Sequence, residues 1–244
     1  MQIENSTVLI TGASSGIGMA TAIAAVQSGA RVALLARRGE RLRELATRLG
    51  PNALALPCDV TVTAQIETCV QKVLDAFGRV DALVNNAGRG FYAPIDKIEV
   101  AAYRALLELN TVAPLAMMQA VVPQMRRQGQ GAIVNVSSGS TFAVLPGAAA
   151  YTSSKAALST LSDVARVELA EAGISVSTIY PFITDTEFYE AVKDGQDAAK
   201  ADIRNAGSAA HPPERVAEKI LGLIRTGERQ DDLVPKEYGG SLNA

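Results

Sequence analysis

The chain alternates short apolar runs with stretches of helical periodicity from one end to the other. The runs are mostly continuous and rich in β-branched residues, as strands buried on both faces are. They cover residues 7–10, 32–35, 53–56, 82–84, 132–136, 174–179 and 233–234. The helical stretches cover residues 17–28, 38–49, 63–77, 100–127, 153–172 and 213–226. This order predicts one α/β domain over residues 1–244, with a seven-stranded, mainly parallel, doubly wound sheet and helices on both faces.

Composition excludes several classes of protein. The formal net charge is −2 and no long block of Lys and Arg occurs, which argues against nucleic-acid binding. No apolar run approaches the roughly 18 residues that span a bilayer, and the N-terminus lacks a signal-peptide pattern, so we expect a cytoplasmic protein without membrane contact. Cys58 and Cys69 indicate buried reduced thiols rather than a disulfide framework. The single histidine, His211, precedes two prolines, which indicates a turn or a helix entry, and no metal site is predicted.

A glycine-rich segment, residues 11–18, follows the first apolar run. Gly12 permits a tight turn, Gly16 leaves room for a ligand, and Gly18 permits close packing of a helix on the strand. The helix that begins near Gly16 adds unpaired amides and a dipole that favour a pyrophosphate. An ordinary strand–helix turn is the alternative, but the position after the first strand favours a Rossmann dinucleotide-binding domain. The predicted contacts are Gly12, Ser14, Ser15, Gly16, Ile17 and Gly18.

Further along the chain, a set of polar motifs resembles the short-chain dehydrogenase/reductase family. The set is Asn85-Asn86-Ala87-Gly88 after the fourth run, Asn110, Ser138, Tyr151-x-x-x-Lys155, and Pro181 with Thr186 after the sixth run. Its order is specific for the family but not for a substrate, and the likeness extends from Thr11 to about Val234. The resemblance implies hydride transfer between a nicotinamide coenzyme and a carbonyl or alcohol.

Hydride transfer to a carbonyl needs a group that stabilises charge on oxygen and then supplies a proton. Lys155 lies one helical turn after Tyr151 and is expected to lower the pKa of the tyrosine hydroxyl from its usual value near ~10. Ser138 ends the fifth run, where its hydroxyl can bind the substrate oxygen. The resemblance implies that Lys155 also binds the nicotinamide ribose and that Asn110 supports a water-linked proton path. Taken singly, these residues could be a surface pair, a turn serine and an exposed asparagine.

The resemblance implies further coenzyme contacts after other strands. Those near the adenosine are Asp59, Val60, Asn85, Ala87 and Gly88, and those near the nicotinamide are Pro181, Ile183 and Thr186, besides Tyr151 and Lys155. Thr186 matches the family residue that binds the carboxamide. Asp59, taken alone, could be a turn cap.

The residues after the second run predict NADP rather than NAD. An acidic residue about 20 positions after the glycine loop binds the ribose hydroxyls of NAD, but this position is Ala36. Arg37 and Arg38 follow, and guanidinium groups bind phosphate well. Arg37 is assigned the main role and Arg38 the secondary one, with Ser14 as a further donor. A solvated helix start is the alternative, although positive charge at a helix N-terminus opposes the helix dipole.

Apolar side chains predict a mainly apolar ketone, aldehyde or secondary alcohol as the substrate. The candidate pocket residues, which could instead pack in the core, are Phe91, Tyr92, Val144, Leu145, Phe182, Phe188 and Tyr189. Phe182 stands where the family usually has glycine. The weakly periodic stretch 184–210 is predicted to be a mobile substrate lid.

Two alternative functions stay open. A 3-oxoacyl-thioester (acyl carrier protein) reductase would need a basic patch, for which Arg89, Arg126 and Arg127 are too few to decide, and the C-terminus lacks an apolar closing segment. A non-catalytic dinucleotide sensor is disfavoured by the intact catalytic set. The resemblance also implies a homodimer or homotetramer, formed through the helix after Asn110 and the helix that carries Tyr151.

Overall fold

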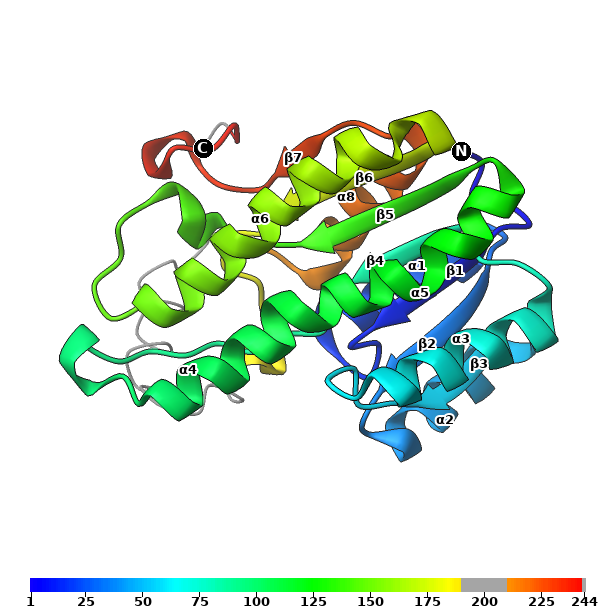
Figure 1. Cartoon of the computed structure of the whole chain (residues 1–244), viewed down its shortest axis with the longest axis horizontal. Helices are drawn as coiled ribbons and strands as arrows, with labels where there is room; N and C mark the ends of the chain where they lie inside the picture. The colour runs from blue at the N-terminus through cyan, green and yellow to red at the C-terminus, as the bar shows by residue number, and fades with distance from the viewer. Residues whose placement is uncertain (190–209, 243–244) are drawn as a thin grey trace.

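The computed structural model describes residues 1–189 and 210–242, and its centre is a seven-stranded sheet (Figure 1). The strands are β1 (Thr7–Thr11), β2 (Arg31–Ala36), β3 (Ala53–Pro57), β4 (Ala82–Asn85), β5 (Gly131–Val136), β6 (Ile174–Tyr180) and β7 (Gln230–Asp232). They lie in the order β3-β2-β1-β4-β5-β6-β7, and every neighbouring pair is parallel. The predicted doubly wound parallel sheet is confirmed.

Helices cover both faces of this sheet. One face carries α3 (Thr63–Phe77), α5 (Ala113–Gln128) and α6 (Ala149–Leu169), and the other carries α1 (Gly16–Gln27), α2 (Gly39–Leu49) and α8 (Pro213–Thr226). The sequence of α8 shows why such helices dock. Its residues Val216, Ile220 and Ile224 recur every four positions, and all three are fully buried in the core. This apolar stripe anchors the helix to the sheet.

The strand order places a crevice at the carboxyl edge of the sheet. From β1 the sheet is built outward to β3 on one side and to β7 on the other. The loops after β1 and β4 therefore diverge, and in open α/β sheets ligands bind at such a switch point. The glycine-rich segment follows β1 and the Asn-Asn-Ala-Gly segment follows β4, so both motifs lie at this crevice.

Three elements differ from their predicted positions. The seventh strand is Gln230–Asp232 rather than residues 233–234; it pairs with β6 through main-chain groups, which polar residues supply equally well, and the two apolar residues are buried just after it. The helix predicted from residue 153 begins at Ala149, which places Tyr151 in its first turn. The long helix predicted over residues 100–127 is divided into α4 (Val100–Leu107), a π turn at Glu108–Val112, and α5.

The run Val100–Gln128 is, within the described part of the chain, the one helical stretch long and apolar enough to cross a bilayer. Its residues Met117, Val121 and Met125 are buried in the cluster that packs on the sheet. Its apolar character is thus that of a core helix.

The stretch predicted as a lid, residues 184–210, is described only at its ends, because residues 190–209 lie outside the described residues. Its beginning is held by His211, whose N–H donates to the Ile183 carbonyl at 2.8 Å and whose carbonyl accepts from the Asp185 N–H at 3.0 Å. Helix α8 starts two residues later at Pro213, which confirms the predicted helix-entry position of His211.

Candidate active site

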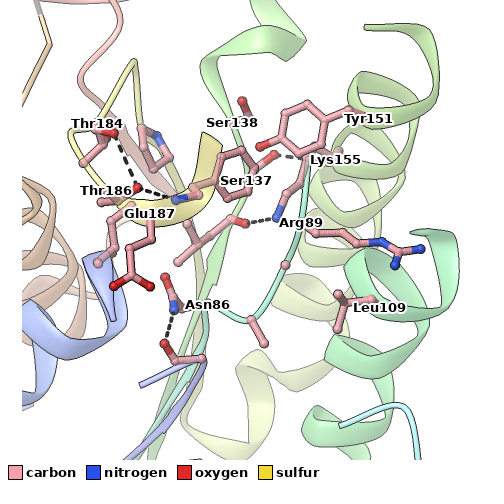
Figure 2. Close-up of a pocket in the computed structure, with 18 of the residues that line it drawn as sticks. Asn86, Arg89, Leu109, Ser137, Ser138, Tyr151, Lys155, Thr184, Thr186 and Glu187 are labelled. Carbon is pink, nitrogen blue, oxygen red and sulfur yellow. Dashed lines mark hydrogen bonds between the residues drawn. The ribbon is translucent and has the colours of Figure 1, made fainter. Parts of the chain in front are cut away.

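A cavity of about 1250 Å³ opens at the carboxyl edge of the sheet (Figure 2). Its walls come from the loops after β1 to β6 and from the C-terminal turn at Lys236–Tyr238. Most of the predicted site residues line it: Gly12, Ser14, Ser15, Gly16, Ile17, Arg37, Arg38, Asp59, Val60, Ala87, Gly88, Ser138, Tyr151, Lys155, Pro181, Ile183 and Thr186. Gly18, Asn85 and Asn110 are outside this lining and lie behind residues that form it.

The glycine loop takes the predicted shape. Gly12 has a φ of +68° and turns the chain away from β1. A Cβ atom on Gly18 would lie 2.5 Å from the Gly12 carbonyl oxygen, so only glycine lets α1 begin this close to the strand. At Gly16 a Cβ atom would lie 3.0 Å from the methyl group of Thr186. Thr186 therefore lies over the N-terminus of α1, with the glycine loop on one side of the cavity and the segment after β6 on the other.

The placement of Asn85 beside the coenzyme is corrected by the structure. Its buried side chain donates to the Asn135 carboxamide oxygen at 2.8 Å and to the Pro114 carbonyl at 3.2 Å, and so holds α5 to the sheet. The next residue, Asn86, lines the cavity instead. Its amide donates to the Thr11 carbonyl at 2.9 Å and to the Gly12 carbonyl at 3.3 Å, which ties the loop after β4 to the glycine loop.

Tyr151 and Ser138 face each other across the cavity wall formed by α6 and the end of β5 (Figure 2). Ser138 lies close enough to the Tyr151 hydroxyl to lower its pKa. The neighbouring serine is unavailable for this role, because the Ser137 hydroxyl is bonded to the Ser159 hydroxyl at 2.8 Å and to the Lys155 carbonyl at 3.2 Å. The choice of Ser138 over Ser137 therefore agrees with the geometry.

The expected lowering of the Tyr151 pKa is not found in the ligand-free protein. Burial raises the pKa of the Tyr151 hydroxyl to about 12, and the hydrogen bond with Ser138 only partly opposes this effect. Burial also lowers the pKa of Lys155 to about 8, and its ammonium donates to the Val136 carbonyl at 2.8 Å. The lower pKa of Tyr151 was inferred from the position of Lys155 one helical turn away. Loss of water around both side chains has the larger effect on their pKa values.

Asn110 lies in the π turn and is fully buried. Its carboxamide clasps the backbone of Arg89, accepting from the N–H at 3.1 Å and donating to the carbonyl at 3.0 Å, and it also donates to the Ser154 hydroxyl at 3.0 Å. A Cβ atom on Gly88 would meet the Asn110 oxygen at 3.2 Å and the Lys155 nitrogen at 3.3 Å. Asn110 thus joins the loop after β4 to the helix of Tyr151, immediately beside Lys155.

Asp59 lines the cavity and also caps a turn, as the alternative interpretation predicted. Its carboxylate accepts from the Thr61 N–H at 3.0 Å and from the Thr61 hydroxyl at 2.8 Å. These hydrogen bonds, with a smaller contribution from Arg37, lower the pKa of Asp59. The carboxylate is therefore fixed at the edge of the cavity next to Arg37.

The arginine that contacts the glycine loop is Arg38 rather than Arg37. Its guanidinium donates to the Ser14 hydroxyl at 3.1 Å and to the Ser15 hydroxyl at 2.5 Å. It also binds the Glu187 carboxylate at 2.8 Å, and Arg41 binds the same carboxylate at 2.7 Å. These two arginines lower the pKa of Glu187, Arg38 having the larger effect. Arg37 lines the cavity as well, but the contacts to the glycine loop are made by Arg38.

The structure brings four of the seven candidate pocket residues to the cavity. Tyr92, Leu145, Phe182 and Phe188 line the cavity, whereas Phe91 packs in a core cluster and Val144 is exposed outside the lining. The side chain of Tyr189 lies outside what the structure describes. Phe182 needs no special backbone, because Asn5 is the one non-glycine residue with positive φ in the described ranges. Its ring lies 5.3 Å from that of Tyr238, between ring centroids.

Among the residues of the cavity wall that were not predicted, three bear on the two ends of the site: Glu187, Glu237 and Tyr238. Glu187 is one of several acidic residues after β6, such as Asp185, and its only sequence clue is the unbalanced positive charge at residues 37–41. Glu237 and Tyr238 come from a C-terminal turn that carries no motif. Their approach to Phe182 depends on how the chain folds after β7.

Comparison with known proteins gives a consistent picture. The family model described as short chain dehydrogenase matches residues 6–197. A sorbitol dehydrogenase of Cereibacter sphaeroides is 40% identical over 208 residues, which cover 84% of this chain and 79% of that protein. An oxidoreductase of Staphylococcus epidermidis is 33% identical over 208 residues, covering 85% of this chain and 90% of that protein.

Solved structures show the same fold. A 3-ketoacyl-(acyl-carrier-protein) reductase from Brucella melitensis, complexed with NADH, aligns with a TM-score of 0.86 at 25% identity, over 94% of this chain and 98% of that chain. A short-chain dehydrogenase/reductase from Burkholderia phymatum, in complex with NAD, aligns with a TM-score of 0.91 over 98% of this chain and 92% of that chain. At 22% identity, the second likeness concerns the fold alone.

Proposed function

The chain belongs to the short-chain dehydrogenase/reductase family and is an oxidoreductase, and from this premise we propose that it is an NADP-dependent enzyme acting on a carbonyl and its secondary alcohol. The observation that carries the proposal is the placement of Ser138 beside Tyr151 in the wall of the cavity (Figure 2), with the buried amine of Lys155 one helical turn away.

The roles of the catalytic residues follow from their positions. Bound NADPH supplies the hydride. Ser138 and Tyr151 together bind the substrate oxygen, and Tyr151 donates its proton to that oxygen as charge develops on it. A pKa raised to about 12 keeps Tyr151 protonated at neutral pH, which suits a proton donor in the direction of carbonyl reduction. Lys155 stabilises the resulting phenolate, and Asn110 holds the loop at Gly88 and Arg89 beside the lysine.

The coenzyme preference rests on the second strand and the glycine loop. Ala36 provides no carboxylate for the ribose hydroxyls of NAD, and Arg38 extends from the end of β2 to the hydroxyls of Ser14 and Ser15. This set offers one cation and two neutral donors to a 2′-phosphate. Arg37 and Arg41 add positive charge on either side. The related 3-ketoacyl-(acyl-carrier-protein) reductase structure carries NADH, which supports a nicotinamide coenzyme as the class, and the arginines favour NADP within it.

The substrate is a ketone, aldehyde or secondary alcohol with an apolar part. The rings of Phe182 and Tyr238 make one wall, and Leu145 and Phe188 extend it toward Tyr151, whose ring lies 5.8 Å from that of Phe188. Such a surface favours a cyclic or aryl group over a polyol. The sorbitol dehydrogenase relative shares the alcohol/ketone chemistry, and its polyol substrate makes a sharp contrast for testing this wall.

The decisive experiment measures NADPH oxidation with a panel of aryl ketones, cyclic ketones, a ketose and a 3-oxoacyl thioester. We expect turnover of aryl or cyclic ketones, with a higher kcat/KM for NADPH than for NADH. A preference for the thioester would replace this substrate class with that of the ketoacyl reductases. Binding of NADPH without turnover of any carbonyl would instead favour a dinucleotide sensor.

We also propose that the enzyme is a homodimer or homotetramer. The exposed apolar residues Val112 and Leu115 lie on the turn before α5 and on α5, and Val164 and Val167 lie on α6. Val167, in the last turn of α6, keeps 77% of its surface exposed, which is a large fraction for an apolar side chain. A mass of 25.5 kDa by light scattering at micromolar concentration would refute the proposal.

A further inference from the structure

Glu187 lies where the coenzyme phosphate of the proposed function would bind. Its carboxylate is hydrogen-bonded to the guanidinium of Arg38 at 2.8 Å and to that of Arg41 at 2.7 and 2.8 Å. The same Arg38 side chain reaches Ser14 and Ser15 of the glycine loop. One carboxylate therefore joins both cations next to the loop.

This carboxylate comes from across the cavity. Glu187 follows β6, whereas Arg38 and Arg41 follow β2. Figure 2 shows Glu187 and Thr186 on the opposite side of the pocket from Tyr151 and Lys155. The neighbouring Thr186 packs over Gly16 at the N-terminus of α1, so the contact places the segment after β6 across the glycine loop.

A carboxylate and a phosphate bind guanidinium groups in the same way, with oxygen atoms accepting parallel N–H donors. The Nη1 atoms of Arg38 and Arg41 are both used by Glu187 in the free protein. A 2′-phosphate at this place must displace Glu187, whereas the 2′-hydroxyl of NAD has no charge with which to compete for these donors.

We propose that Glu187 is a coenzyme-specificity residue that occupies the 2′-phosphate site of the free protein and lowers its selectivity for NADP over NAD. The inference rests on the proposed coenzyme preference. Arg38 and Arg41 lie at the N-terminus of α2, where positive charge opposes the helix dipole. The carboxylate of Glu187 compensates part of this charge when no coenzyme is bound. Competition for this place also links arrival of the phosphate to release of the segment that carries Thr186.

The size of the effect follows from exposure. The side chains of Arg38, Arg41 and Glu187 are 45%, 48% and 46% exposed, and ion pairs at such positions hold a conformation only weakly. Competition from Glu187 therefore lowers the affinity of the protein for the 2′-phosphate by a moderate factor. We expect Glu187→Gln to tighten phosphate binding by about three- to tenfold.

The test uses fragments that separate the phosphate from the rest of the coenzyme. The Kd values of 2′,5′-ADP and 5′-AMP, which differ by the 2′-phosphate alone, are measured by isothermal titration for the wild type and for Glu187→Gln. We expect 2′,5′-ADP to bind the variant about three- to tenfold more tightly and the affinity for 5′-AMP to change less than twofold. Fluorescence titration with NADPH and NADH should give the same contrast.

Glu40→Gln is the matched control. Glu40 lies in the first turn of α2 between the two arginines and is exposed, so its loss changes the charge near them without breaking the contact to Glu187. We expect this variant to resemble the wild type within twofold. An equal gain in both variants would show a general charge effect and overturn the role of Glu187.

The two proposals fail separately. Equal wild-type affinity for 2′,5′-ADP and 5′-AMP would contradict the coenzyme preference. An unchanged or weaker affinity of Glu187→Gln for 2′,5′-ADP, in a protein that does prefer it, would contradict the competition alone. Thermal unfolding of each variant, followed by circular dichroism, shows that the compared proteins are folded.

Discussion

Two groups of polar side chains share one cavity but lie in opposite environments. Tyr151 and Lys155 are 9% and 4% exposed and are held by Ser138 and by the backbone of β5. Arg38 and Glu187, at the other end, are nearly half exposed and bind each other. In the first group the loss of water shifts protonation, while in the second group water and salt weaken each charge–charge contact. Equal changes of chemistry should therefore have unequal effects in the two places.

The largest effect is expected at the buried group. Tyr151→Phe removes the proton donor and keeps the ring, and we expect kcat to fall by the ~10²–10⁴-fold typical of a lost general acid. Coenzyme affinity should stay within about threefold of the wild type, because the hydroxyl makes only part of that contact. The matched control is Tyr238→Phe, which removes a hydroxyl from the same cavity. A similar loss in both variants would remove the distinction between Tyr151 and an ordinary wall residue.

Lys155→Met tests desolvation directly, through stability rather than activity. The folded-state pKa of Lys155, about 8, lies below its ordinary value of 10.5, so the unfolded state binds more protons between pH 8 and pH 10. Wild-type stability should therefore rise with pH in this window relative to the variant, by up to about 3 kcal/mol. Urea unfolding of the ligand-free proteins at pH 7 to 10 measures it.

The control for this measurement is Lys97→Met, at a lysine whose side chain is 73% exposed. Its stability difference from the wild type should be independent of pH over the same range. A flat profile for Lys155→Met as well would mean that its ammonium is hydrated in the folded protein.

A smaller effect is expected at the exposed group. Arg38→Ala should weaken NADPH binding by about 1.5–3 kcal/mol, the contribution of a charge-assisted hydrogen bond, and leave NADH binding nearly unchanged. The difference should shrink as salt is raised, because exposed charges are screened. Arg37→Ala is the paired variant, and a larger loss there would restore the assignment made from the sequence.

The smallest effect concerns the aromatic wall formed by Phe182 and Tyr238. In a cycle of Phe182→Ala, Tyr238→Ala and the double variant, KM for an aryl ketone should rise in each single variant, with a coupling of about 0.5–1.5 kcal/mol. An additive cycle would show that the two rings do not act together on the substrate.

The parts of the molecule that follow from local pattern were predictable. Continuous apolar runs located six of the strands, and the spacing of Tyr151 and Lys155 located two residues of the site. The edge strand β7 was misplaced because its polar residues, Gln230 to Asp232, pair through the main chain and leave no apolar pattern. Desolvation was also missed at Tyr151, since burial depends on what the rest of the chain packs around it.

Contacts between distant segments could not be predicted from the sequence. Nothing local indicates that Glu187 crosses the cavity to Arg38, 149 positions earlier. The motif after β4 predicted the right loop but the wrong asparagine, because Asn85 and Asn86 differ only in which side of the backbone they take. Such choices are made by packing, here against Pro114 and Asn135.

The π turn at Glu108–Val112 makes the helices α4 and α5 sensitive to length rather than composition. Removing one residue from a helix rotates everything beyond the deletion by about 100° and shifts it by about 1.5 Å. A deletion here would restore a regular α-helix and turn Asn110 away from Arg89 and Ser154, while Met117 and its neighbours could keep α5 in the core. A related chain with a one-residue gap at this point would keep Ser138, Tyr151 and Lys155 intact. We would nevertheless expect such a protein to fold but to lack the contacts that Asn110 makes with Arg89 and Ser154. The one-residue gap would therefore identify chains whose site is incomplete.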